Sequence, residues 1–321
     1  MQPEAPQPSE NSQPAKGLPP VAPPSGRFIA QLFLVPGLIV AVAVLIYLGS
    51  SYLVRSSHTP ESFLKELDSV NPEIRWRGAH DLAQVLKRPE SLKLASDPKF
   101  ALDLAERLDK ALAEVEKEEK ASLEDIEKEV KKRGKELTQG ERDAVWRKLA
   151  NQRNHVLFLI ACMGDFTIPV GAPLLGEVAL KDTGAEIKGV TLRRRRAVWA
   201  LANLGDNFKR RYLGERSETP KPDEKVLSAE QKAAIIAELQ DEVKQGGKRA
   251  EWARAALRPL QGQPSGVDAV LERCASADDP YLRSLIAHAL NFWDGDRVEP
   301  TLLRLARDDG HGKILEITET D

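Results

Sequence analysis

The chain has 321 residues, of which 30% are charged and only 5% aromatic. This composition favours helical repeats over a β-sandwich or barrel, which would contain more aromatic and β-branched residues. The 47 basic and 49 acidic residues nearly cancel, so overall charge argues for neither a polyanionic nor a polycationic partner. Cys162 and Cys274 lie far apart and on apolar helical faces, so no small disulfide-stapled fold is indicated.

Residues 1–27 are rich in Pro, Gln and Ser and contain almost no large apolar side chains. Such a segment buries too little apolar surface to offset the entropy lost on ordering. We therefore predict a disordered, proline-rich tail over residues 1–27. No P-x-x-P motif with a flanking specificity residue stands out, which favours a solvated tether over a docking motif.

An uncharged run of 27 residues follows, from Phe28 to Val54, bracketed by Arg27 and Arg55. A helix of about 20 apolar residues crosses the apolar core of a bilayer, so this run is long enough to span it. Cleaved signal peptides have shorter apolar stretches, of about 7–15 residues. The sequence predicts a single transmembrane helix over residues 28–54, which makes the lipid bilayer a partner, and a short linker over residues 55–60.

The sequence does not indicate which side of the membrane holds the rest of the chain. Orientation usually follows the excess of basic residues on one flank. Lys16 and Arg27 precede the run within 20 residues, while Arg55 and Lys65 follow it, so the count is equal. The prediction is therefore a single-pass membrane protein of undetermined topology.

A repeated pattern runs through residues 61–321. Its fullest copy is AVWALANLGD, from Ala197 to Asp206, and an earlier copy is VLFLIACMGD, from Val156 to Asp165. Apolar residues at +3, +4 and +7 mark one face of a helix. Gly164 and Gly205 fit the position just after a helix, where a left-handed backbone favours glycine.

Looser copies occupy the rest of this region. Asn71-Pro72 and Asp279-Pro280 each open an apolar helical stripe, with Asn or Asp as the N-cap and Pro in the first turn. A further stripe begins near Arg249. Between these helices lie predicted partner helices of similar length: Lys99–Leu112, Val170–Leu180, Ala229–Val243, Gly266–Ala275 and Val298–Asp308. The sequence thus predicts an all-α fold built from helix pairs.

The pattern resembles the HEAT-repeat family, especially the short bacterial form found also in phycobilin lyases. The residues that carry the resemblance are Asp279, Pro280, Leu282, Arg283, Ala289 and Leu290 for the first half of the motif, and Ala197, Ala200, Leu201, Leu204, Gly205 and Asp206 for the second. The resemblance implies an α-solenoid of about five HEAT-like helix pairs over residues 61–321. Asp81 and the pair Asp294-Gly295 depart from the family pattern.

Residues 111–142 interrupt the repeats with a mostly charged segment. Its Glu and Lys side chains recur at three- and four-residue spacing, which stabilises a solvated helix. Only a thin apolar stripe accompanies them, and no sustained heptads are present. The first interpretation is an extended helix or helical hairpin that stands off the repeats, and the second is a coiled-coil contact with another copy.

The sequence contains no catalytic, phosphate-binding or metal-binding motif that we recognise. His155 and Cys162 share a helical face, but the apolar run around them places the thiol toward a core. Asp294 and Asp296 lack the further oxygen ligands of a calcium loop. We therefore predict no catalytic residues, no cofactor and no metal, and interpret the chain as not an enzyme.

The clearest surface feature is the run Arg193, Arg194, Arg195 and Arg196 at the start of a repeat helix. One interpretation is a solvated helix end with one arginine bonded to a neighbouring turn. The other is a patch that contacts an acidic protein segment, lipid headgroups or nucleic acid. Trp199 is the one aromatic residue nearby, which argues against nucleic acid. We take the four arginines as candidate partner-binding residues.

The predicted function is a membrane-anchored protein–protein interaction scaffold, since curved helical solenoids bind proteins or peptides along extended faces. A fold alone does not assign a function, so two alternatives stay open. One is a structural subunit of a membrane complex. The other is a lyase-like, chromophore-handling protein, against which the missing catalytic constellation and the anchor both argue.

Overall fold

The computed structural model describes residues 36–47, 59–181, 188–215 and 225–307, together with Arg27 and Leu34. The predicted tail up to residue 26, residues 55–58 of the predicted linker, and residues 28–33, 35 and 48–54 of the predicted span lie outside the described residues. Residues 36–47 are helical. In the part of the chain that is described, no helix combines the length and apolarity that crossing a membrane requires.

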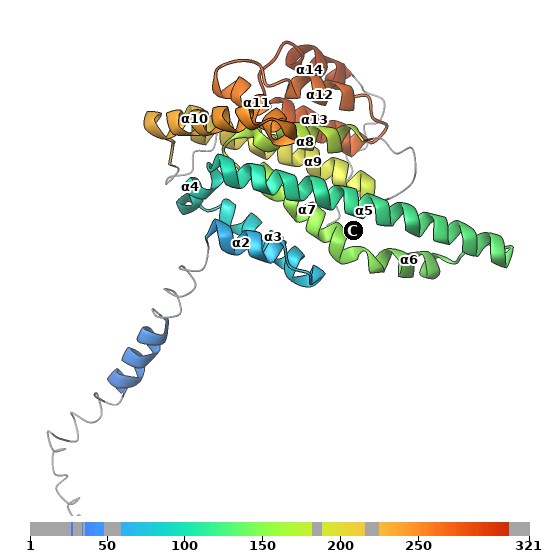
Figure 1. Cartoon of the computed structure of the whole chain (residues 1–321), viewed down its shortest axis with the longest axis horizontal. Coiled ribbons are helices and arrows are strands. Elements are labelled where there is room, and N and C mark those ends of the chain that lie inside the picture. Colours follow the sequence, from blue (N-terminus) through green and yellow to red (C-terminus); the bar gives the residue numbers. More distant parts are fainter. Residues whose placement is uncertain are drawn as a thin grey trace, which may run out of the picture. The chain divides into compact units, whose positions relative to one another are not determined.

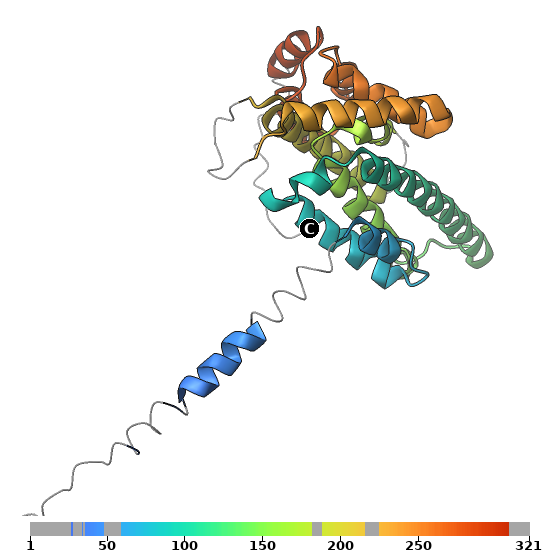
Figure 2. The same ribbon diagram turned by 60° about the vertical axis from the view of Figure 1, so that its left-hand side comes forward.

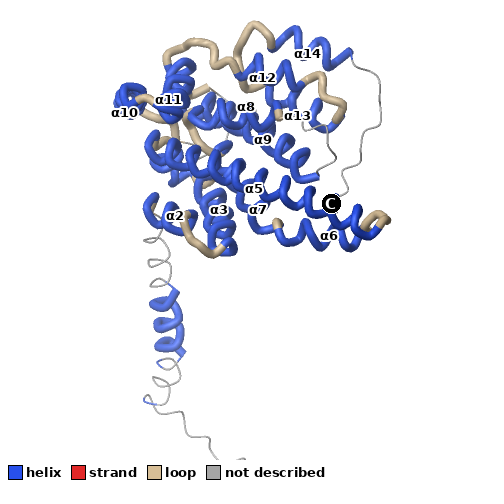
Figure 3. Tube along the Cα trace, turned by 45° about the vertical axis from the view of Figure 1, so that its right-hand side comes forward, coloured by secondary structure: helices blue, strands red, loops and turns tan. Residues whose placement is uncertain are grey.

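Contacts divide the chain into two units, Met1–His58 and Thr59–Asp321. In the second unit the described residues form helices and no strands, which confirms the all-α prediction for them (Figures 1 and 3). The helices are α2 (Pro60–Leu67), α3 (Pro72–Leu86), α4 (Leu92–Ala95), α5 (Pro98–Arg133), α6 (Gln139–Lys148), α7 (Ala150–Gly164), α8 (Ala172–Leu180), α9 (Lys188–Asn207), α10 (Ala229–Gln245), α11 (Gly247–Leu260), α12 (Val267–Cys274), α13 (Pro280–Leu290) and α14 (Val298–Arg307). Short 3₁₀ turns η1 (Pro89–Ser91) and η2 (Pro169–Gly171) precede α4 and α8, and the π-helical turn η3 (Phe208–Leu213) continues α9.

The second unit is organised around one row of helices. Helices α3, α7, α9 and α13 pack side by side in that order, each against the next. A second set lies alongside: α2 packs on α3, α5 on α7, α8 on α9, and α12 on both α8 and α13. The starts of α3 and α13 are set by the predicted caps, since the side chains of Asn71 and Asp279 accept hydrogen bonds from the first-turn amides.

Helices α10 and α11 follow α9 in the sequence but do not pack beside it in the row. In a simple sequential stack they would separate α9 from α13, yet α9 and α13 contact each other directly. Helices α10 and α11 instead pack on each other and against α5, α8 and η2 (Figure 2, orange). The chain leaves the row after η3 and returns to it between α11 and α12.

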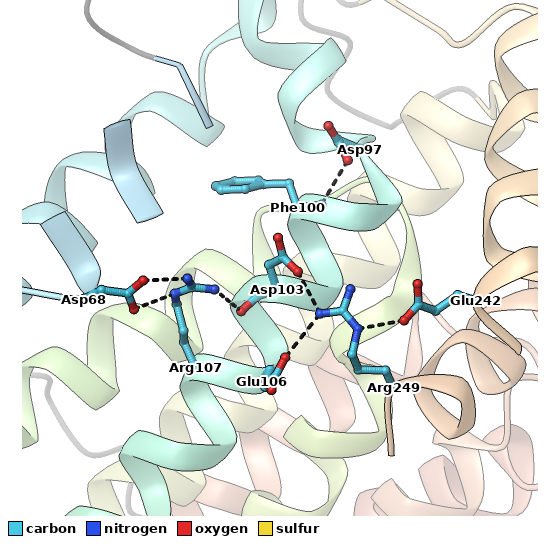
Figure 4. A network of polar contacts seen from close by, with 8 residues as sticks. All are labelled: Asp68, Asp97, Phe100, Asp103, Glu106, Arg107, Glu242 and Arg249. Carbon is cyan, nitrogen blue, oxygen red and sulfur yellow. Dashed lines mark hydrogen bonds and ion pairs between the residues drawn. The ribbon is translucent and has the colours of Figure 1, made fainter. Parts of the chain in front are cut away.

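Ion pairs on both sides of α5 hold it between α2 and α11 (Figure 4). The Arg249 guanidinium of α11 donates to Asp103 on α5 and to Glu242 on α10, each at 2.7 Å. On the other side, Arg107 donates to both carboxylate oxygens of Asp68, at 2.9 and 2.7 Å. These partly exposed pairs position α5 with only modest effect on stability.

Helix α5 is a single helix of 36 residues, so the predicted helix Lys99–Leu112 and the charged segment that follows it are continuous. The segment 111–142 becomes the second half of α5, a turn at Gly134 and the first residues of α6. The second half of α5 extends beyond the neighbouring helices, with α6 beside it (Figures 1 and 3). Arg133 bonds to both Glu129 and Glu141, which joins the end of α5 to the start of α6.

The expected role of the motif glycines is wrong. Gly164 ends α7 and Gly205 lies within α9, and neither has the positive φ of a left-handed residue. A Cβ at Gly164 would lie 2.8 Å from the Ala200 Cα and carbonyl oxygen, and one at Gly205 would lie 2.7 Å from the Phe292 Cβ. Glycine stands at these positions because α9 approaches α7, and the residues after α13 approach α9, too closely for a side chain.

This close approach predicts that Gly164→Ala destabilises the domain by about 1–3 kcal/mol, because the added methyl group overpacks a backbone contact. Gly140→Ala is the matched control. It lies in the first turn of α6, where an added Cβ would have no heavy atom within 4 Å, so alanine should stabilise the domain by up to about 1 kcal/mol. Urea unfolding of residues 59–321, followed by circular dichroism, measures both. Equal effects of the two substitutions would contradict the packing argument.

Candidate functional site

The four arginines at the start of α9 have different surroundings. Arg193 is 4% exposed and donates two hydrogen bonds to Glu119, at 2.9 and 2.7 Å. Arg194 donates to the Ala179 carbonyl oxygen at 3.0 Å. Arg196 is exposed. Together with Arg195, these side chains do not form a single cationic surface.

Arg195 links α9 to the following helix of the row. Its guanidinium donates to the two carboxylate oxygens of Asp279, at 2.8 and 3.1 Å, and lies over the Tyr281 ring at 5.0 Å. Asp279 also caps α13 by accepting from the Tyr281 and Leu282 amides. Burial alone would raise the pKa of Asp279, but the hydrogen bonds from Arg195 and the amides hold it below its usual range.

Glu119 is the central group of the site, and it is only 3% exposed. Its Oε1 accepts from Arg153 Nε and Arg193 Nη1, both at 2.9 Å, and its Oε2 accepts from Arg193 Nη2 at 2.7 Å. Burial would raise the pKa of Glu119, but the bonds and charges of Arg193 and Arg153 lower it overall. Glu119 is therefore a buried carboxylate that joins α5, α7 and α9.

The sequence contained a signal for Glu119 that motif searching missed. Glu119 lies four residues after Val115 and four before Leu123, on the thin apolar stripe of the charged segment. A carboxylate on the buried face of a helix requires a cationic partner. The partner Arg193 was within the arginine run, whereas nothing in the local sequence distinguishes Arg153.

Arg153 brings a second guanidinium to Glu119, so the three groups together carry one net positive charge. The Arg153 guanidinium carbon lies 4.5 Å from the centre of the Trp146 ring, and its Nε is bonded to Glu119. Its Nη2 is buried and has no hydrogen-bond partner among the described residues. A buried donor without an acceptor costs about 1–3 kcal/mol, so Arg153 is held at this site at some cost in stability.

Two cavities adjoin these charges, and Arg193 lies in the wall of both. The α5–α8 groove has a volume of about 620 Å³ and is lined by Asp109, Leu112, Ala113, Glu116, Glu119, Lys120, Leu123, Leu174, Glu177, Val178, Leu180, Lys181 and Arg193. The α6–α9 cavity has a volume of about 410 Å³ and is lined by Asp143, Trp146, Arg147, Ala150, Arg153, Asn154, Leu157, Leu192 and Arg193.

Aromatic side chains also stack between neighbouring helices of the row. Trp76 of α3 stacks with Phe158 of α7 at 6.2 Å, and Trp199 of α9 stacks with His288 of α13 at 5.5 Å. Trp199 is 40% exposed, so it lies at the surface and not in the core. These pairs make part of the row's surface aromatic, which is typical of protein contact surfaces.

Cys162 and His155, the pair on one helical face that catalysis would need, are both buried. The Cys162 thiol is fully buried and donates to the Ala79 carbonyl oxygen at 3.3 Å, and burial raises its pKa well above the usual range. His155 is buried, which lowers its pKa to about 4, with a further contribution from the Arg75 charge. In the described ranges, no group of three or more His, Cys, Asp and Glu side chains is arranged to hold a metal ion.

Comparison with known proteins adds no assignment: no protein-family model, curated protein or solved structure matches the chain. The resemblance of the repeats to the HEAT family therefore stays a prediction from their residues. The site is defined by its own geometry, namely a buried carboxylate, two arginines and two adjoining cavities.

The charge balance predicts that removing the Glu119 carboxylate destabilises the domain more than removing the Arg193 guanidinium does. Glu119→Leu leaves the buried Arg193 guanidinium and the partly buried Arg153 guanidinium without their shared carboxylate, and should destabilise the domain by about 3–5 kcal/mol. Arg193→Met leaves Glu119 paired with Arg153 and should cost less. Urea unfolding of residues 59–321 compares the two variants. A larger loss for Arg193→Met would show that the ion pair with Arg153 does not hold the carboxylate.

Proposed function

We propose that the protein is a membrane-anchored interaction scaffold. In this proposal residues 28–54 form a transmembrane helix, residues 61–321 form an α-solenoid of HEAT-like helix pairs, and the α5–α8 groove binds a segment of another protein. The groove is the observation that carries the proposal. Its partner is a protein or peptide, because the surrounding charges include both signs and offer no uniformly basic surface for nucleic acid.

The arrangement of the helices supports the solenoid. A row of helices flanked by a second set is the architecture that stacked helix pairs produce, and such stacks present extended surfaces to partners. The departure of α10–α11 from the row is compatible with it, because α8–α9 and α12–α13 still stack directly on each other.

The composition of the groove supports a peptide as the ligand. Leu112, Leu174 and Val178 form a buried apolar floor, 7%, 2% and 6% exposed. Charged side chains surround it, and Lys181 donates to Glu116 at 2.5 Å across the α5 and α8 sides. Apolar anchors of a partner would bury on the floor, while its polar groups meet the charged rim.

A photo-cross-linking residue placed at Ala113 tests the groove, since Ala113 is exposed and lines it. We expect a light-dependent adduct with a discrete partner in membranes from the native host. The same residue at Ala144, exposed on α6 and outside the groove, should give no such adduct. Identical adducts from both positions, or none from Ala113, would contradict the proposal. A stable membrane complex that co-purifies without a groove adduct would favour a structural subunit.

The anchor is tested separately, because the uncharged run of 27 residues motivates it. The full chain should stay with the membrane pellet after alkaline carbonate extraction, which strips proteins held only at the surface. A chain that begins at Thr59 should be found in the soluble fraction without detergent. Release of the full chain by carbonate would rule out a spanning helix.

A further inference from the structure

The α6–α9 cavity combines apolar walls with arginine side chains. Trp146 of α6, Leu157 of α7 and Leu192 of α9 contribute apolar surface to its walls. A volume of about 410 Å³ lies within the range of small-molecule sites. The cavity shares only Arg193 with the lining of the α5–α8 groove, and a ligand bound there would not depend on the proposed scaffold function.

The charges around this cavity favour an anion. Arg147, Arg153 and Arg193 line it, against Asp143 as the acidic residue in the lining. Glu119 neutralises only one of the two arginines that it contacts. Asp143 and Arg147 carry opposite charges and cancel. The side chains around the cavity therefore carry one net positive charge, which matches a monoanion.

The guanidinium of Arg153 is held in position before such an anion binds. Its guanidinium carbon lies 4.5 Å from the centre of the Trp146 ring, and its Nε donates to Glu119, so contacts on two sides hold the group. The side chain of Arg153 is 18% exposed and lines the cavity. Because the guanidinium is held in place before any ligand arrives, a ligand that pairs with it loses little to reorganisation.

We propose that the α6–α9 cavity binds a small carboxylate carried on an apolar ring or chain. The carboxylate pairs with the Arg153 guanidinium where it lines the cavity, since guanidinium and carboxylate groups match in planarity and charge. The apolar body contacts Trp146 and Leu192. A phosphate dianion fits less well, because its second charge has no counterpart in the balance around the cavity.

The probe is 2-naphthoate, with 2-naphthylmethanol as the neutral compound of the same shape. The full chain in zwitterionic lipid nanodiscs is labelled with 5-fluorotryptophan, so that its five tryptophans report separately by fluorine NMR. Trp146→Phe assigns the Trp146 signal. Naphthoate should shift this signal and leave the other four in place, and the alcohol should bind about tenfold or more weakly, as expected for loss of a charged hydrogen bond.

Two substitutions complete the test. Leu192→Glu puts a competing carboxylate at the cavity and should weaken naphthoate binding about tenfold or more. Leu303→Glu on α14 is the matched control, since Leu192 and Leu303 are 48% and 49% exposed, and should leave binding unchanged. Arg153→Gln should also weaken binding while Glu119 keeps its pair with Arg193.

Unchanged tryptophan signals outside the cavity confirm that each variant is folded. The proposal is overturned if naphthoate shifts all five signals alike, if the alcohol binds equally well, or if Leu192→Glu and Arg153→Gln both bind naphthoate as the unsubstituted chain does.

Discussion

The close approach of successive helices in the row is the constraint on which the rest of the domain depends. At Gly164 the backbone of α7 lies against Ala200 of α9, and at Gly205 α9 lies against Phe292. These contacts fix the position of each helix along its axis relative to the next helix. They thereby bring Arg195 of α9 to Asp279. A shift of α9 by one residue would break this ion pair and also the pair between Arg193 and Glu119 of α5.

The sequence predicted the local structure of the domain well where local chemistry decides it. Apolar spacing and the caps at Asn71 and Asp279 located helices that the structure contains. The role of Gly164 and Gly205 was misjudged because a glycine near a helix end fits both a left-handed cap and a close packing contact. Only the neighbouring helix distinguishes them, and it is remote in sequence.

Other features depend on tertiary contacts that no local pattern encodes. The charged second half of α5 continues a helix that Leu104 and Leu108 anchor in the core, and the sequence pattern did not indicate that the two segments form one helix. The site was predicted only through Arg193. Its role depends on Glu119, 74 residues away, and on Arg153, so an arginine run that resembles a surface patch contains a buried ion pair.

Because α10–α11 leaves the row, the contacts between α9 and α13 join distant parts of the chain. Trp293 Nε1 donates to the Leu201 carbonyl oxygen across 92 residues, whereas Gly164 and Ala200 are 36 apart. Loop-closure entropy grows only logarithmically, so the longer loop costs about 0.8 kcal/mol more. The larger effect is on the rate of folding, because contacts between residues far apart in the sequence slow folding. The last helices can dock only after the long intervening segment has been accommodated.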